Sequence, residues 1–154
     1  MSTIAVLTII HGLPAIALIG AITHQGFSVW RKPAPARVFI DRFRAVGGVG
    51  YANSISLMYV LTFAMGAYIY PTFVLDVKAS VADAGMRSTI GVFQVKEHVA
   101  VLGLSLLPAY WHYWRRSPAT ENVGTRRLLT TLVMLCTWWS LLIGHVLNNV
   151  RGLI

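Results

Sequence analysis

Four long apolar runs constrain this chain more than any other feature of its sequence. They cover about residues 4–30, 49–70, 90–114 and 128–150. Roughly 20 apolar residues in a helix cross the hydrocarbon core of a bilayer, and each run is long enough. Lipid offers no partner to backbone polar groups, so each run is predicted to be a helix. We therefore expect an all-α integral membrane protein, with residues 1–154 forming a single four-transmembrane-helix bundle in contact with membrane lipid.

The formal net charge of +8 is concentrated in two of the three connections between these runs. The basic residues there are Arg31, Lys32, Arg37, Arg42 and Arg44 in the first connection, and Arg115, Arg116, Arg126 and Arg127 in the third. Short loops rich in lysine and arginine stay in the cytoplasm, so both termini are predicted to lie outside. Topology accounts for the charge, and we expect no nucleic-acid partner and a location in the bacterial inner membrane.

All five histidines fall within the apolar runs, where ionisable side chains are uncommon and usually face the bundle interior. We measured the depth of each from the first basic residue at the cytoplasmic end of its run. His98, His145 and His11 are 17, 18 and 20 residues from that end, whereas His24 and His112 are 7 and 3 residues from it. The histidines therefore form an outer and an inner level.

The first and third runs cross the membrane in the same direction, and each carries one histidine at both levels. This predicts that His11 faces His98 and that His24 faces His112. The fourteen-residue step from His98 to His112 returns to within about 40° of the same helix face and rises about 21 Å. The thirteen-residue step from His11 to His24 leaves those two about 140° apart, unless Pro14 bends the helix between them. His145 is the alternative outer partner, and Met65 is a more remote one.

Haem suits such pairs, because haem iron takes one axial imidazole from each side and needs only two facing helices. The pattern predicts two b haems held by His11, His24, His98 and His112. Arg31, Arg115 and Arg87 are candidate cations for the haem propionates near the two membrane surfaces. A copper or zinc site built from His11, His98 and His145 is the alternative at the outer level.

Histidines thirteen or fourteen residues apart on two parallel spans of a four-helix bundle resemble those of the di-haem b-type membrane cytochromes. This group includes cytochrome b561-like proteins and the core of respiratory cytochrome b. The resemblance implies electron transfer across the membrane, to or from a quinone, as a subunit of a larger complex with other redox subunits. Two bis-imidazole irons would have no open coordination position, which also favours electron transfer over chemistry at iron.

Two other classes of function stay open at this point. The first is a cofactor-free membrane anchor or assembly subunit, in which the histidines pack against partner spans. The second is a proton or metal-ion transporter, which the small number of acidic residues in the spans disfavours. Glu97, next to His98, is expected to be a surface charge or a proton acceptor for a quinol at the outer face.

Overall fold

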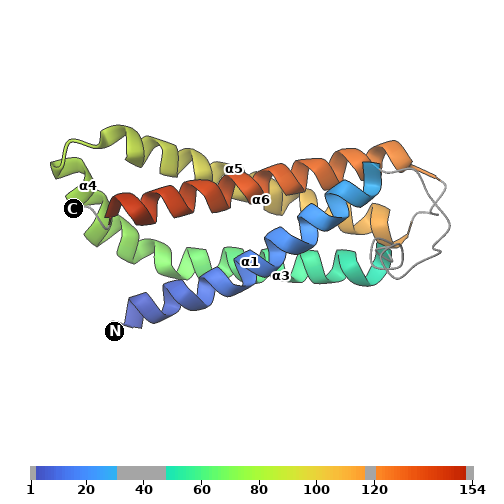
Figure 1. Cartoon of the computed structure of the whole chain (residues 1–154), viewed down its shortest axis with the longest axis horizontal. Coiled ribbons are helices and arrows are strands. Elements are labelled where there is room, and N and C mark those ends of the chain that lie inside the picture. Colours follow the sequence, from blue (N-terminus) through green and yellow to red (C-terminus); the bar gives the residue numbers. More distant parts are fainter. Residues whose placement is uncertain (1–2, 31–47, 117–120, 152–154) are drawn as a thin grey trace.

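The computed structural model describes residues 3–30, 48–116 and 121–151 of the chain, and these fold into helices (Figure 1). The elements are α1 (Thr3–Trp30), α3 (Gly48–Thr72), the π-helical turn η1 (Phe73–Val77), α4 (Lys78–Asp83), α5 (Arg87–Arg115) and α6 (Val123–Arg151). Four spans, at Thr3–Trp30, Gly50–Asp83, Arg87–Arg115 and Val123–Asn149, are long and apolar enough to cross a membrane. The prediction of an all-α protein with four such helices is confirmed.

The second span is longer than its apolar run. The sequence predicts an end near residue 70, but the helix passes through Pro71 and continues as η1 and α4 to Asp83. Proline lacks the backbone N–H that would bond to the preceding turn, and a π-helical turn accommodates such a local change in hydrogen bonding. The predicted connection of residues 71–89 therefore contains helix, and only Ala84 to Met86 separate α4 from α5.

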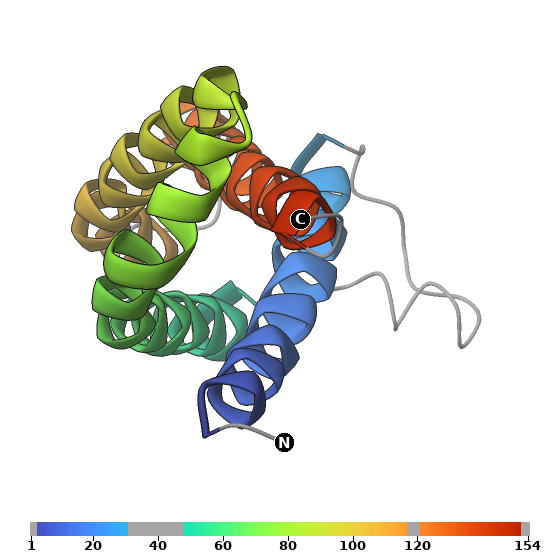
Figure 2. The same cartoon turned by 90° about the vertical axis from the view of Figure 1, so that its left-hand side faces the viewer.

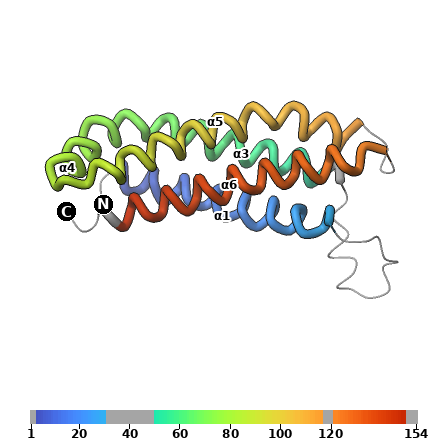
Figure 3. Tube along the Cα trace, turned by 90° about the horizontal axis from the view of Figure 1, so that it is seen from above, coloured from blue at the N-terminus to red at the C-terminus, as the bar shows by residue number. Residues whose placement is uncertain are grey.

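The four long helices surround a common axis (Figure 2). Helices α3 and α6 each pack against both α1 and α5, which places α1 and α5 diagonally across the bundle. The two chain termini lie at the same end of the bundle as α4, as Figures 1 and 3 show. We call this the terminal end, and we call the opposite end, where α1 and α5 finish, the loop end.

Apolar side chains fill the bundle interior from its middle to the loop end. The packed core consists of Leu18, Ile22, Ala52, Ile55, Tyr59, Leu107, Tyr110, Leu129 and Val133. Ile22, Ile55 and Val133 are completely buried, and so is Tyr110, whose hydroxyl donates a hydrogen bond to the Gln25 side-chain carbonyl. Protein interiors of this kind are close-packed, so this half of the bundle leaves little room for a large planar cofactor.

Two arginines at the start of α6 tie the loop end together. Arg127 Nε donates to the Val29 carbonyl of α1 over 2.8 Å, and Arg126 Nε donates to the Tyr113 carbonyl of α5 over 2.8 Å. The Arg127 guanidinium also lies 5.4 Å from the centroid of the Trp30 ring. The last carbonyls of a helix lack intrahelical partners and carry partial negative charge. The start of α6 thus caps the ends of both neighbouring helices.

Replacing Arg126 by alanine should lower the free energy of unfolding by about 2 kcal/mol, because a hydrogen bond from a charged group is lost at a nearly buried position. Thermal or denaturant unfolding in detergent measures this change. Arg116→Ala is the matched control, since the Arg116 side chain is exposed at the end of α5 and its loss should cost less than about 0.5 kcal/mol. Equal losses for the two variants would contradict the capping role of Arg126.

Candidate functional site

A cavity of about 460 Å³ lies among the four helices in the half of the bundle nearer the terminal end. Its lining is mostly apolar and includes Ala15, Leu18, Phe63 and Val101, while its polar members come from every one of the four helices. Those polar residues are Thr8, His11, Tyr59, Thr62, Tyr70, Lys96, Glu97, Thr137, Ser140, His145 and Asn148. A hollow of this size that combines apolar surface with convergent polar groups is typical of a small-molecule or cofactor site. We call it the terminal-end cavity.

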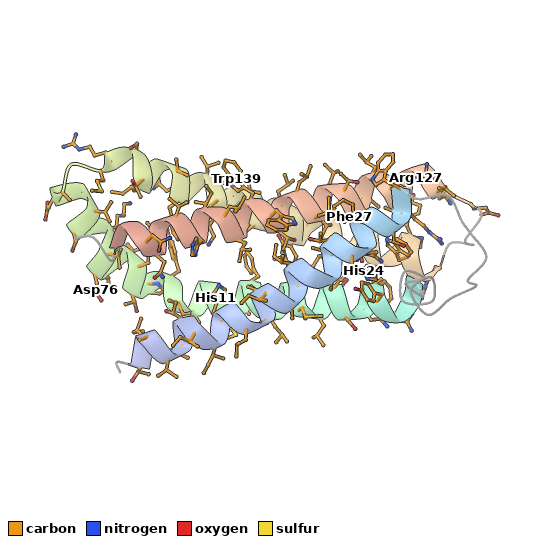
Figure 4. The ribbon with its side chains drawn as sticks, in the orientation of Figure 1. His11, His24, Phe27, Asp76, Arg127 and Trp139 are labelled. Atoms are coloured by element: carbon orange, nitrogen blue, oxygen red, sulfur yellow. The ribbon has the colours of Figure 1, made fainter. Side chains whose placement is uncertain are left out.

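Two of the five histidines line the terminal-end cavity, namely His11 of α1 and His145 of α6. The His11 ring packs over Gly66 of α3, where a Cβ atom would lie 3.4 Å from His11 Cε1. His11 Nδ1 is buried and has no hydrogen-bond partner. Figure 4 shows His11 on the stretch of α1 that runs beside α3. His11 packs on α3 and His145 belongs to α6, so the two residues line the cavity from different helices, and the His145 side chain is exposed.

A lysine and a glutamate line the same cavity from neighbouring positions of α5. The Tyr70 hydroxyl forms a hydrogen bond with the Glu97 carboxylate. The Lys96 ammonium lies 4.7 Å from the centroid of the Phe93 ring, which in turn stacks on Phe73 of η1 at 4.1 Å. A second hollow of about 160 Å³ shares these polar residues with the cavity and reaches η1. The cavity thus has a charged and aromatic mouth at the terminal end.

His98 does not line the terminal-end cavity. Its side chain is exposed, and its Nδ1 is 2.8 Å from the Gln94 carbonyl of its own helix. Helix geometry explains this placement, because His98 is about 140° around α5 from the buried residues Phe93 and Gly103. The expected pairing of His11 with His98 is therefore not formed in this structure, and the second histidine that lines the cavity with His11 is His145.

The two histidines of the inner level do not meet either. His24 Nδ1 lies 3.2 Å from the Tyr51 hydroxyl of α3, and the His24 and Tyr51 rings pack edge to face. His112 is exposed on α5 and packs edge to face on the neighbouring Tyr113 ring. Between these positions the interior is filled by the apolar core around Tyr110. The structure does not bring His24 and His112 together around a space for a second haem.

The predicted propionate cations are not placed at the cavity. Arg31 lies outside the described residues, Arg87 is exposed at the start of α5, and the Arg115 guanidinium lies 4.8 Å from the centroid of the Trp111 ring at the loop end. Lys96 is the cation that lines the cavity. Sequence reasoning named Lys96 among the outer cations that a haem propionate could use and placed Tyr70 at the membrane interface, but it gave Asn148 no role.

The alternative of a three-histidine copper or zinc site is not supported. Within the described residues, no group of three or more His, Cys, Asp or Glu side chains is close enough to share a metal ion. His98 does not line the cavity that His11 and His145 share, so these three residues do not form one set of ligands. Met65, the remote candidate ligand, is also absent from the lining of the cavity.

Comparisons with known proteins found no matching family model, no matching curated protein and no matching solved structure. The functional argument therefore depends on the residues and geometry described above.

Proposed function

We propose that this chain is a membrane electron-transfer subunit that holds one b haem in the terminal-end cavity, between His11 and His145. One observation carries this proposal: of the five histidines, these two line the same cavity, and they do so from different helices. Bis-imidazole haem needs two such donors and a slot between them. The proposal keeps the haem chemistry expected from the sequence but reduces it from two haems to one within a single chain.

The lining of the cavity fits a macrocycle in three respects. Its volume of about 460 Å³ lies in the range of cofactor and small-molecule sites. Gly12, Gly66 and Gly144 line it, so three positions of the wall add no side-chain bulk. The His11 ring has a hydrogen bond with the Thr62 backbone, but its Nδ1 is buried without a hydrogen-bond partner, and an unsatisfied buried nitrogen costs free energy unless a bound group or water compensates it.

Each polar residue of the cavity has a role in this proposal. A bis-imidazole haem supplies a one-electron redox couple and leaves no coordination position for oxygen. His11 and His145 would hold the haem through their imidazole nitrogens. Lys96 offers an ammonium to a propionate, since charge-assisted hydrogen bonds to carboxylates are strong. The Glu97 carboxylate, held by Tyr70, is placed to accept a proton from a quinol electron donor at the mouth.

The proposal also states how the chain is oriented in the membrane and in which membrane it lies. Basic residues before α3 and around the start of α6 favour the cytoplasmic side for the loop end, which puts both termini and the cavity mouth outside. An electron-transfer subunit of this kind would lie in the bacterial inner membrane. Its partners would be quinone or quinol and the other redox subunits of a larger complex. A chain of 154 residues with four membrane spans has little other surface on which to bind a soluble substrate.

The ligation state of the purified protein tests this proposal. We expect a b-type spectrum after reduction with dithionite and a low-spin signal in electron paramagnetic resonance, because both axial positions are taken by imidazole. Carbon monoxide should leave the reduced spectrum unchanged for the same reason. A spectrum that shifts fully with carbon monoxide would mean that one axial position is open, and the pairing of His11 with His145 would then be wrong.

A cofactor-free anchor or assembly subunit is the second candidate, and the outward face of α5 favours it. That face carries His98, Ser105 and His112 in exposed positions, as expected for contact with another transmembrane helix. This alternative predicts a colourless protein even after expression with sufficient haem. Any b haem bound through His11 and His145 would exclude it.

A further inference from the structure

Side chains of α1 and α6 interlock in the half of the bundle nearer the loop end. Two indole N–H groups donate hydrogen bonds to threonine hydroxyls over 3.0 Å and 2.8 Å, and between them a buried glycine lies directly against a methionine side chain. We call this line of contacts, with its continuation toward the terminal end, the α1–α6 seam. The contacting pairs are Trp30 with Thr131, Gly26 with Met134, and Thr23 with Trp138.

The continuation of the seam runs along the terminal-end cavity. Residues three or four apart share one face of a helix, so steps of this size from the last closed pair give the next facing positions. These positions are Ile19 with Leu141, Ala15 with His145, and Gly12 with Asn148. All six residues line the cavity.

The α1–α6 seam is therefore open at the level of the cavity. No side chain or neighbouring helix among the described residues lies within 4 Å of the Cβ position at Gly12 or at Gly144. Figures 1 and 2 show α1 and α6 close together at the loop end and apart at the terminal end. The His145 side chain, which belongs to the open part of the seam, is exposed.

The other three pairs of neighbouring helices touch at or beside the cavity. A histidine ring packs on a glycine, a tyrosine hydroxyl donates to a backbone carbonyl over 3.0 Å, and a cysteine lies close to a buried glycine. The contacts are His11 on Gly66 between α1 and α3, Tyr59 with Ala100 between α3 and α5, and Cys136 beside Gly103 between α5 and α6. The α1–α6 seam is thus the side on which the cavity opens between helices.

The open seam is bordered by lipid-facing side chains. Leu13 and Ile16 of α1 are exposed, and so are Leu142 and Val146 of α6. Both helices are long and apolar enough to span a membrane, so these exposed apolar side chains contact acyl chains in a bilayer. The cavity consequently opens toward the lipid along the seam.

We propose that the α1–α6 seam is the route by which haem enters the cavity from the membrane. This inference rests on the proposed function, because it takes haem as the ligand of the cavity. Haem is flat and mostly apolar, so it dissolves in a bilayer. Gly12 and Ala15 add little bulk to the route, and His145 lies on the seam itself. Lys96 lines the cavity from α5, diagonally opposite α1, and offers a cation to the haem carboxylates.

Photolabelling by lipid tests whether the seam is open, and it needs no haem. Protein expressed without added haem is reconstituted with a phospholipid that carries a diazirine on its acyl chain. After irradiation, mass spectrometry locates the labelled residues. We expect Ile19 and Leu141 to be labelled as strongly as the exposed Leu142, with no label on Gly26, which is buried in the closed part of the seam. Absence of label from Ile19 and Leu141 would overturn the proposal.

Narrowing the seam tests its use by haem. Gly12→Phe adds a large side chain to open space on the seam, and Gly20→Phe adds the same side chain at an exposed position of α1 that does not line the cavity. Haem is supplied in donor liposomes, and its uptake is followed by the b-type absorption. We expect uptake by Gly12→Phe to be roughly tenfold slower than in the wild type, and uptake by Gly20→Phe to be unchanged. Equal rates in the two variants would overturn the proposal.

Haem release separates a narrowed route from a filled site. Entry and exit share one route, so Gly12→Phe prepared with haem should also lose it to excess apomyoglobin roughly tenfold more slowly than the wild type. Faster loss would mean that the phenylalanine displaces haem inside the cavity, and it would overturn the assignment of the route. A wild-type protein that takes up no haem would reject the proposed function, whereas the lipid label would still decide whether the seam is open.

Discussion

Replacing His145 by alanine is expected to remove the b haem from the purified protein. His145 is proposed to supply one of the two axial nitrogens, and the cavity holds no third histidine that would replace it. Loss of a ligand to a metal weakens binding far more than loss of an outer hydrogen bond, which already costs 10–100-fold. Haem extracted and counted per chain should therefore fall at least about tenfold. His11→Ala should have the same effect.

His98→Ala is the matched control for this experiment. His98 lies at nearly the same depth as His145, and both side chains are exposed, but His98 does not line the terminal-end cavity. Its replacement should leave haem content and the reduced spectrum unchanged. Loss of haem in His98→Ala with retention in His145→Ala would restore the ligand pair predicted from the sequence and would reject the pair inferred from the structure.

Replacing Gly103 by valine is expected to destabilise the bundle by about 3 kcal/mol or to prevent folding. Gly103 of α5 is buried against Tyr59 of α3 and Cys136 of α6. A Cβ atom there would overlap the Tyr59 hydroxyl and lie 3.0 Å from Cys136 Cβ. Tyr59 cannot simply turn away without loss, because its hydroxyl donates a hydrogen bond to the Ala100 carbonyl over 3.0 Å. The melting temperature in detergent and the yield of monodisperse protein measure the effect.

Gly20→Val is the control for the substitution at Gly103. Gly20 is exposed on α1, and nothing lies within 4 Å of the Cβ position there. The same chemical change should then alter stability by less than about 0.5 kcal/mol, as is usual at exposed positions. A Gly103→Val protein as stable as Gly20→Val would show that the helices at this crossing are further apart than described.

The four helices were predictable from sequence because membrane thickness sets a minimum length for an apolar run. The extension of the second span to Asp83 was not, since α4 has the sequence KASVAD and lacks a long apolar pattern. The predicted sharing of one helix face by His98 and His112 also holds, because helix geometry fixes it. Whether this shared face points into the bundle or away from it depends on how α5 is rotated about its own axis.

That rotation is difficult to predict in a membrane helix. In a water-soluble bundle the polar face marks the outside, but here the outward side chains along the middle of α6, such as Leu132, Leu135 and Leu142, are apolar like the core. In a membrane helix, polar residues are therefore expected to face the bundle interior. This expectation placed His98 and His112 there. Lys96 and Tyr70 lie near the ends of their apolar runs, which suggested a flanking cation and an interfacial aromatic, whereas both residues line the cavity.

The number of haems per chain tests the central claim most directly. The purified protein, expressed with sufficient haem, is assayed for haem by alkaline pyridine extraction and for protein by amino-acid analysis. We predict about one b haem per chain, because one cavity is lined by two histidines and the rest of the interior is filled by apolar core. Two haems per chain, or none, would contradict the assignment of a single site to His11 and His145.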